Sequence, residues 1–343
     1  MIADPLLYGV FAAIVVVLLA VDLLVVHRKT HEVSIREAAT WTAIWIGVSI
    51  VFGLLIPRFH EGVGPGNPVV EYFTGYVIEK SLSVDNVFLF LLIFSALAVP
   101  RELQHRVLFY GVLGAIAMRT VLIFAGVALI ERFEWLLYVF GAFLIYAAVR
   151  TFRERNDHPD VASSPIFQRV QRILPTTADY RGDRFFVREN GRLLATPMFV
   201  VLVLVEFTDL IFAMDSIPAI FAITRDPFIV LTSNIFAIMG LRALYFLLAG
   251  VADRLRYLKT GLAIILGYVG LKLFTENIEA VYHPTPLQSL AVIATVLTVT
   301  VAASLRSPPV EGAIPPSGIG PFTSRSREPG AKSGEPPRPS EAG

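Results

Sequence analysis

Two stretches of the chain place carboxylates inside otherwise apolar sequence, at 79–86 and at 206–218. The second lies in a run from 196 to 224 that has no charge besides its own three acids. A charge held inside a membrane span costs at least about 2.5–3.5 kcal/mol, so such residues are expected to serve a function. The carboxylates concerned are Glu79 and Asp85 in the first stretch and Glu206, Asp209 and Asp215 in the second.

Composition indicates the kind of element that must hold these carboxylates. Of the 343 residues, 55% are hydrophobic and 17% are charged, and the mean hydropathy is +0.65. A soluble globular domain carries about 25% charged residues, so an all-α polytopic membrane protein is the expected class. The chain has no cysteine, which excludes disulfides and thiolate metal sites.

Apolar segments of about 20 residues can cross a bilayer as helices. We predict a transmembrane domain over 1–305, followed by a disordered tail over 306–343 that is rich in Pro, Gly and Ser. Nine spans are expected within the domain: 6–26, 38–57, 70–99, 107–130, 133–149, 197–224, 228–252, 260–280 and 287–305.

The distribution of Arg and Lys predicts how these spans are oriented. Connections after the odd-numbered spans carry 22 of these residues, and connections after the even-numbered spans carry three. Basic residues concentrate in cytoplasmic connections, so we place the N-terminus outside and the C-terminus in the cytoplasm.

The longest connection, 150–196, is basic and is expected to be cytoplasmic. A small β-hairpin is predicted near 184–195, because Asn190-Gly191 is a preferred pair for a type I′ turn. We interpret the basic residues as contacts to lipid headgroups rather than to nucleic acid.

Four features recur in the same order, offset by 122 to 130 residues, which predicts an internal repeat. Spans 3–5 would start outside and spans 6–8 inside, so the two three-helix copies would be inverted. Inverted repeats are a transporter architecture with a midplane site between the copies. The alternative is that helices rich in small residues resemble one another for packing reasons. The paired features are Glu79-x5-Asp85-Asn86 with Asp209-x5-Asp215-Ser216, Arg119 with Arg242, Ala125–Ala128 with Ala249–Ala252, and Tyr146-x3-Arg150-x-Phe152 with Tyr268-x3-Lys272-x-Phe274.

Acids outnumber bases within the predicted spans, because Asp22 joins the five carboxylates above and only Lys80, Arg119 and Arg242 oppose them. Arg119 and Arg242 could simply neutralise acids and lock the bundle. A bound cation would balance this excess of negative charge, and protonation of some carboxylates would also remove the excess. A proton-coupled metal carrier needs both events in turn: its carboxylates bind the cation in one state and are protonated in the other.

Residues six apart on an unbroken helix point about 120° from each other, so neither Glu79 and Asp85 nor Asp209 and Asp215 share a face. A helix break would let each pair converge. Pro218 predicts one, because it cannot donate to the carbonyl of Met214.

The side chains available as ligands limit which metal ions the site could bind. All six histidines fall in the predicted connections, so a midplane site has oxygen ligands. Oxygen ligands suit Mn²⁺, Mg²⁺ or Ca²⁺ and disfavour Zn²⁺ or Cu⁺, although carboxylates alone also serve Na⁺ and H⁺.

The two acidic motifs, the hairpin segment 185–191 and the following Ala195-Thr-Pro197 resemble the TerC family of integral membrane proteins over about residues 5–305. The resemblance implies a bacterial inner-membrane protein related to manganese export and to alkaline-inducible Alx proteins. Tellurite, which gave the family its name, is an anion that an acid-rich cavity would repel. Carried over by motif, the metal candidates are Glu79, Asp85, Asp209 and Asp215, with Asn86, Ser216 and Glu206 as secondary candidates.

Two functions are expected from these observations. The first is a transporter that exports a hard divalent cation by alternating access, with Mn²⁺ as the favoured ion. The second is a membrane assembly or stress-resistance factor whose linker docks partners. An enzyme is not expected, since the chain has no nucleophile–histidine pair in a span, no P-loop and no histidine-based zinc motif.

Overall fold

The structure is a computed structural model. It describes residues 5–26, 34–62, 66–154, 168–169, 173–177, 179–189, 191–249, 257–275, 278, 282 and 284–307. The predicted tail from 308 onward and most of 155–172 lie outside the described residues.

Helices dominate the described chain and confirm an all-α polytopic membrane protein. Serine, asparagine, aspartate and threonine side chains cap the first turns of four helices, and five helices begin with proline. Both residue classes favour the start of a helix. The helices are α1 (Pro5–Val26), α2 (Ile35–Leu55) with a 3₁₀ turn (Ile56–Arg58), α3 (Pro68–Ala96), α4 (Arg101–Arg132), α5 (Leu136–Arg153), α7 (Pro197–Phe221), α8 (Pro227–Met239), α9 (Leu241–Ala249), α10 (Leu258–Thr275) and α11 (Pro286–Arg306).

By length and composition, seven of the described helices could cross a membrane, or eight if α8 and α9 form one bent span. Helix α3 is long enough, at 29 residues, but Glu79, Lys80 and Asp85 keep it outside that count. The total of nine spans therefore stays a prediction.

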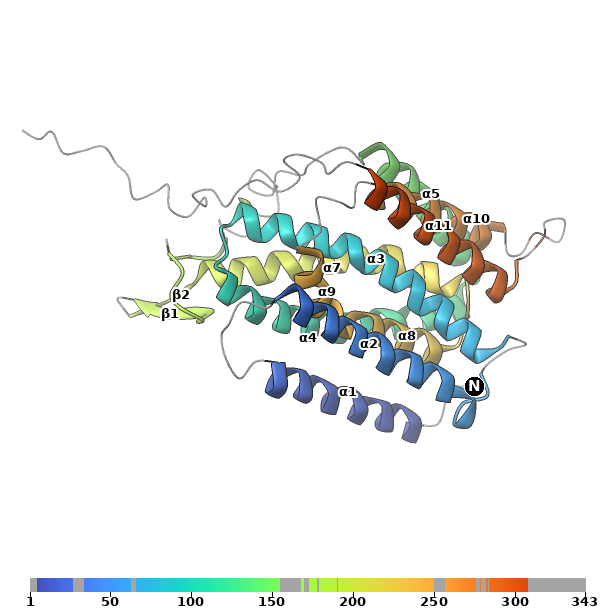
Figure 1. The fold of residues 1–343 in the computed structure, drawn as a ribbon, viewed down its shortest axis with the longest axis horizontal. Coiled ribbons are helices and arrows are strands. Elements are labelled where there is room, and N and C mark those ends of the chain that lie inside the picture. Colours follow the sequence, from blue (N-terminus) through green and yellow to red (C-terminus); the bar gives the residue numbers. More distant parts are fainter. Residues whose placement is uncertain are drawn as a thin grey trace, which may run out of the picture.

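The helices run roughly along one direction, with α3 passing through the middle of the bundle (Figure 1). Helix α1 lies at one side, and α5, α10 and α11 gather at the opposite side (Figure 1). Every residue of α8 is buried, so this helix is the centre of the core. A helix that is apolar and buried all round must be enclosed by other helices rather than by lipid.

The predicted break at Pro218 is wrong. Helix α7 continues through Pro218 to Phe221. The proline lies in the last turn, and the single hydrogen bond that it removes does not end the helix. The break falls instead at Gly240, where α8 and α9 differ in direction by 41°.

The predicted β-hairpin is present. Strand β1 (Phe186–Glu189) pairs antiparallel with β2 (Arg192–Ala195), with Glu189 opposite Arg192. Gly191 has a φ of +76°, as the tight turn requires. Asn190 lies outside the described residues. The hairpin projects beyond the helix ends and leads directly into α7 (Figure 1).

Helices α3 and α7 cross antiparallel with a regular register. Asn86 contacts Asp209 at 3.5 Å, Glu79 and Ser216 contact the same guanidinium nitrogen, and a Cβ at Gly75 would lie 3.3 Å from Ile220. Glu79 of the first motif thus lies level with Ser216 of the second, and Asp209 of the second lies level with Asn86 of the first. An inverted repeat would have this arrangement, and the repeat itself stays a prediction.

Helix α5 packs closely along α10 through glycine. A Cβ built at Gly270 would lie 2.9 Å from the backbone nitrogen of Ile145 and 2.8 Å from the Cβ of Leu144. Small residues permit such close approach of helix backbones in membranes.

Replacing Gly270 by alanine is therefore expected to destabilise the protein by about 1–3 kcal/mol, since backbone atoms must move to admit the methyl group. The matched control is Gly267→Ala on the same helix, where the added Cβ would meet Ala148 at an ordinary 3.6 Å. Thermal unfolding in detergent micelles measures both variants. Equal melting temperatures would contradict the close packing of α5 on α10.

Candidate cation-binding site

Arg119 of α4 joins carboxylates from two distant parts of the chain. Its Nη1 donates to Oε1 of Glu79 on α3. Its Nε and Nη2 donate to the two carboxylate oxygens of Asp209 on α7, at 3.1 and 2.9 Å. The three residues are at most 2% exposed. A guanidinium between two carboxylates offsets the large cost of burying each charge.

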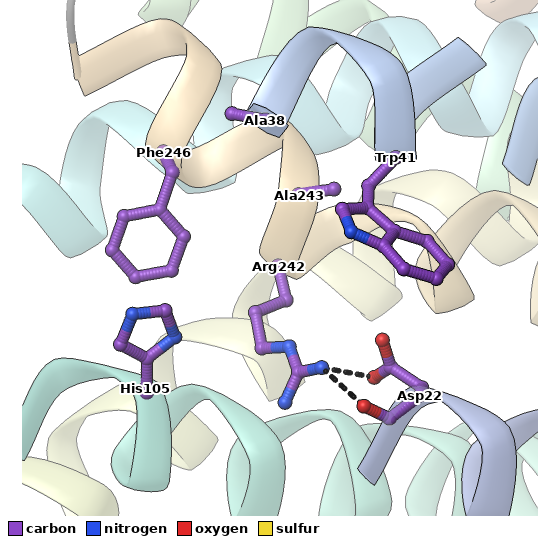
Figure 2. Close-up of a pocket in the computed structure, with 7 residues that line it drawn as sticks. All are labelled: Asp22, Ala38, Trp41, His105, Arg242, Ala243 and Phe246. Atoms are coloured by element: carbon purple, nitrogen blue, oxygen red, sulfur yellow. Dashed lines mark hydrogen bonds and ion pairs between the residues drawn. The ribbon is translucent and has the colours of Figure 1, made fainter. Parts of the chain in front are cut away.

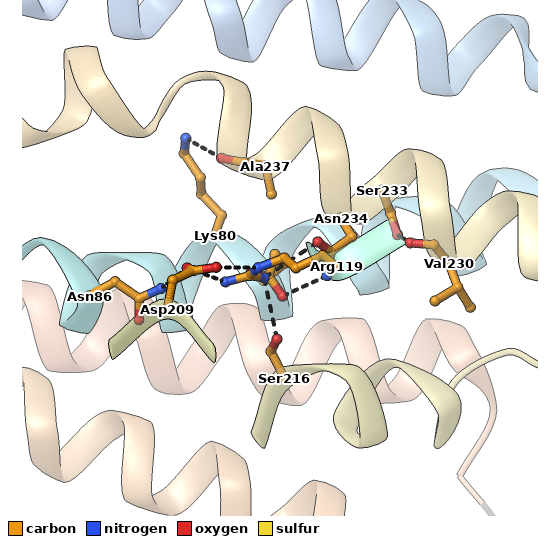
Figure 3. A network of polar contacts seen from close by, with 10 residues as sticks. Lys80, Asn86, Arg119, Asp209, Ser216, Val230, Ser233, Asn234 and Ala237 are labelled. Atoms are coloured by element: carbon orange, nitrogen blue, oxygen red, sulfur yellow. Dashed lines mark hydrogen bonds and ion pairs between the residues drawn. The ribbon is translucent and has the colours of Figure 1, made fainter. Parts of the chain in front are cut away.

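Neutral polar side chains complete this cluster (Figure 3). Asn234 of α8 donates to Oε2 of Glu79 at 3.1 Å and accepts from Arg119 at 3.3 Å. Ser216 accepts from Arg119 at 3.4 Å, and Asn86 donates to Asp209 at 3.5 Å. We call these six residues the Arg119 cluster. Asn86 and Ser216 are candidates that the sequence identified.

Asn234 is a site residue that sequence reasoning missed. It ends a polar triplet, Thr232-Ser233-Asn234, within an otherwise apolar span. Asn234 sits at 0% exposure and bridges the buried ion pair, so it completes the hydrogen bonds that buried charges require.

Replacing Asn234 by alanine is expected to cost about 1–3 kcal/mol, because Glu79 and Arg119 each lose a buried hydrogen bond. The matched control is Ser233→Ala. Ser233 is equally buried, but its hydroxyl donates only to the Val230 carbonyl of its own helix among the described contacts. Unfolding in detergent should separate the two variants, and a larger loss for Ser233→Ala would contradict the assignment.

Lys80 lies beside the cluster, where it holds the bend between α8 and α9. Its ammonium donates to the carbonyl of Ala237 at 3.2 Å, one turn before the break (Figure 3). A Cβ at Gly240 would lie 3.0 Å from that ammonium. Glycine and an inserted side chain are both ordinary causes of a sharp bend.

Asp85 and Asp215 differ from the acids of the cluster. Both are half-buried, and neither forms a hydrogen bond or ion pair with any part of the chain that the structure describes. They lie within electrostatic range of each other. Asp85 also interacts with Lys259 and Asp215 with Arg150.

The remaining secondary candidates lie apart from the cluster's hydrogen bonds. Glu206 packs its carboxylate against Gly114 of α4. Met214 is 53% exposed, so its side chain lies on the outer surface of the bundle. Arg242 pairs with Asp22 at 2.6 Å, although Arg242 corresponds to Arg119 in the predicted repeat.

The structure thus divides the four main candidates into two pairs. Glu79 and Asp209 share Arg119, whereas Asp85 and Asp215 keep their oxygens uncommitted within the described chain. Among the residues that the structure covers, no three His, Asp or Glu side chains are clustered closely enough to hold a metal ion. A role in metal binding stays a prediction for all four carboxylates.

These features define a polytopic helical membrane protein with a buried charge cluster where its central helices cross. Residues 65–310 match the integral membrane protein TerC family, so the chain belongs to the TerC family.

Known relatives cover nearly the whole chain. An uncharacterised membrane protein of Myxococcus xanthus is 49% identical over 89% of this chain and 93% of its own length. A protein of Escherichia coli K12 named "putative membrane-bound redox modulator Alx" is 47% identical over 87% of this chain and 94% of its own. A membrane protein of Rickettsia bellii is 41% identical. No solved structure matches the chain.

Proposed function

We propose that this protein transports a hard divalent cation, most of all Mn²⁺, out of the cytoplasm by alternating access. We expect the protein to lie in the bacterial inner membrane. The distribution of Arg and Lys favours an N-terminus outside and a C-terminus in the cytoplasm. The cation would be bound by carboxylates at the crossing of α3 and α7, and protons are the counter-ion that the same carboxylates could carry.

One observation carries the proposal: two carboxylates at this crossing are hydrogen-bonded to Arg119, and the other two accept no hydrogen bond from the described chain. Arg119 offsets Glu79 and Asp209, whereas Asp85 and Asp215 lie near each other with no hydrogen-bonding partner in the described chain. A purely structural acid in a membrane span is normally paired. Carboxylates whose oxygens accept no hydrogen bond have those oxygens available to bind a transient cation.

Further oxygen atoms on α3 support this assignment. The hydroxyl of Ser83 and the side-chain oxygen of Asn86 are buried and have no hydrogen-bond partner among the described residues. Both flank Asp85 in sequence. Carboxylate, amide and hydroxyl oxygens are ligands for hard divalent cations, which favours Mn²⁺, Mg²⁺ or Ca²⁺ over Zn²⁺.

The Arg119 cluster suggests how access could alternate. Its guanidinium sits between two acids as a tethered cation, so Glu79 and Asp209 become available only when Arg119 moves. The bend at Gly240, held by Lys80, places a broken helix next to the same cluster. Broken helices at the midplane are the moving parts of many transporters.

The proposal is tested with purified protein in proteoliposomes. Uptake or release of Mn²⁺, Mg²⁺, Ca²⁺ and Na⁺ is followed with and without a pH gradient. We expect Mn²⁺ flux above that of protein-free liposomes, and we expect the pH gradient to change its rate.

Absence of flux for all four ions would favour the alternative, an assembly or stress-resistance factor. In that case, deleting 156–182 should remove the cellular phenotype more completely than either Asp85→Asn or Asp215→Asn. A larger loss of the phenotype in the aspartate variants than in the deletion variant would favour transport.

A further inference from the structure

A small cavity lies at one end of the bundle, between the ends of α1, α2, α4 and α9 (Figure 2). It holds about 280 Å³ of empty space, including its open mouth. His105 at its edge is 14 residues before Arg119 on α4, about 21 Å along the helix, so the cavity is separate from the Arg119 cluster. The lining residues are Asp22, Ala38, Trp41, His105, Arg242, Ala243 and Phe246.

Arg242 places an unused donor in this cavity. Its side chain is buried, with 4% exposure for the residue. Nη2 bonds to Oδ2 of Asp22 at 2.6 Å and to the Asp22 carbonyl at 3.3 Å. Nη1 is buried and has no partner within the described chain, and it points away from Asp22 (Figure 2). A buried charged donor without a partner is unfavourable, which predicts that a ligand or water completes its hydrogen bonds.

The walls of the cavity favour an anion over water alone. The ring of Phe246 stacks on His105 with 4.1 Å between centroids, and Ala38 and Ala243 leave space around the guanidinium. Apolar walls lower the local dielectric and so strengthen a charged hydrogen bond. A guanidinium whose Nη2 already bonds to Asp22 can donate from Nη1 to a second oxyanion, and charged donors of this kind bond strongly to phosphate oxygens.

The position of the cavity indicates where such an anion would come from. It lies where α1 ends and where α2 and α4 begin, at the end of the bundle that carries the Arg- and Lys-rich connections. Trp41 at its wall is a residue type enriched at headgroup depth. Basic pockets between helices at the cytoplasmic side are sites for anionic lipid headgroups.

We propose that this cavity is a phosphate-binding site in which Nη1 of Arg242 donates to a phosphate oxygen and His105 provides a second contact. The phosphate belongs to an anionic phospholipid or to a free anion, and the site would fix α9 against α1, α2 and α4. The proposal does not depend on the transport function.

The test uses the full-length protein in nanodiscs. Melting temperature is measured in phosphatidylcholine alone, in phosphatidylcholine with phosphatidylglycerol, and in phosphatidylcholine with added inorganic phosphate. The main variant is Asp22→Asn/Arg242→Gln, which leaves no unpaired charge. His105→Gln is the second variant, because it spares the Asp22–Arg242 ion pair if the double variant does not fold. The control is Arg36→Gln, which removes an exposed charge from the first turn of α2.

We expect wild type and Arg36→Gln to be stabilised by at least one phosphate source, with binding weakened by about tenfold or more in the Asp22→Asn/Arg242→Gln variant. Stabilisation by phosphatidylglycerol alone assigns the site to a lipid, and stabilisation by inorganic phosphate assigns it to a free anion. The proposal is overturned if neither source stabilises wild type. It is equally overturned if the cavity variants that fold respond as strongly as Arg36→Gln.

Discussion

Replacing Arg119 by glutamine is expected to destabilise the protein by about 3–5 kcal/mol, the usual cost of leaving a buried charge without its partner. Arg119 neutralises Glu79 and Asp209, and all three residues are at most 2% exposed. Without the guanidinium, two carboxylates face each other in a site that excludes water. The expected result is poor membrane insertion or a large drop in melting temperature in detergent.

A triple variant separates the charge from the packing. Glu79→Gln/Arg119→Gln/Asp209→Asn removes all three charges and keeps amides at each position, so no unpaired ion remains. Neutral replacement of a buried ion network is often close to neutral for stability. We expect the triple variant to recover most of the lost stability. A triple variant as unstable as Arg119→Gln would show that the geometry of the cluster matters more than its charge.

Replacing Asp215 by asparagine is expected to abolish Mn²⁺ flux in proteoliposomes and to leave the fold intact. Asp215 accepts no hydrogen bond from the described chain, and the Arg150 side chain that attracts it is 59% exposed. The fold therefore depends little on the charge of Asp215, whereas binding of a divalent cation would depend on it strongly. Losing one of a few anionic ligands weakens binding of a hard cation sharply, because these sites are tuned by ligand charge. Flux and melting temperature are measured on the same preparation.

The control for Asp215→Asn is Glu131→Gln, which removes an exposed acid at the end of α4. It should transport at the wild-type rate. Asp85→Asn should behave like Asp215→Asn, since the two carboxylates interact. Wild-type flux in both aspartate variants would exclude the proposed role of this pair.

Much of the architecture could be predicted because hydrophobic length and turn chemistry are local properties. The helix bounds of α1 and α11 fall within two residues of the expected spans, and the hairpin forms around Gly191 as its turn requires. Pro218 misled the prediction because the effect of a proline depends on its distance from the helix end. The bend at Gly240 depends on Lys80 and Trp45, which reach it from other helices.

The sequence by itself determined that acids lie inside membrane spans, that the internal ligands are oxygen atoms, and that Glu79 and Asp85 occupy different faces of one helix. Only the tertiary structure decided the partners: Arg119 joins Glu79 to Asp209, Asn234 bridges that pair, and Arg242 turns to Asp22. Helical periodicity determines the direction in which a side chain points. The helix that it meets depends on how the bundle packs, which residue spacing does not encode.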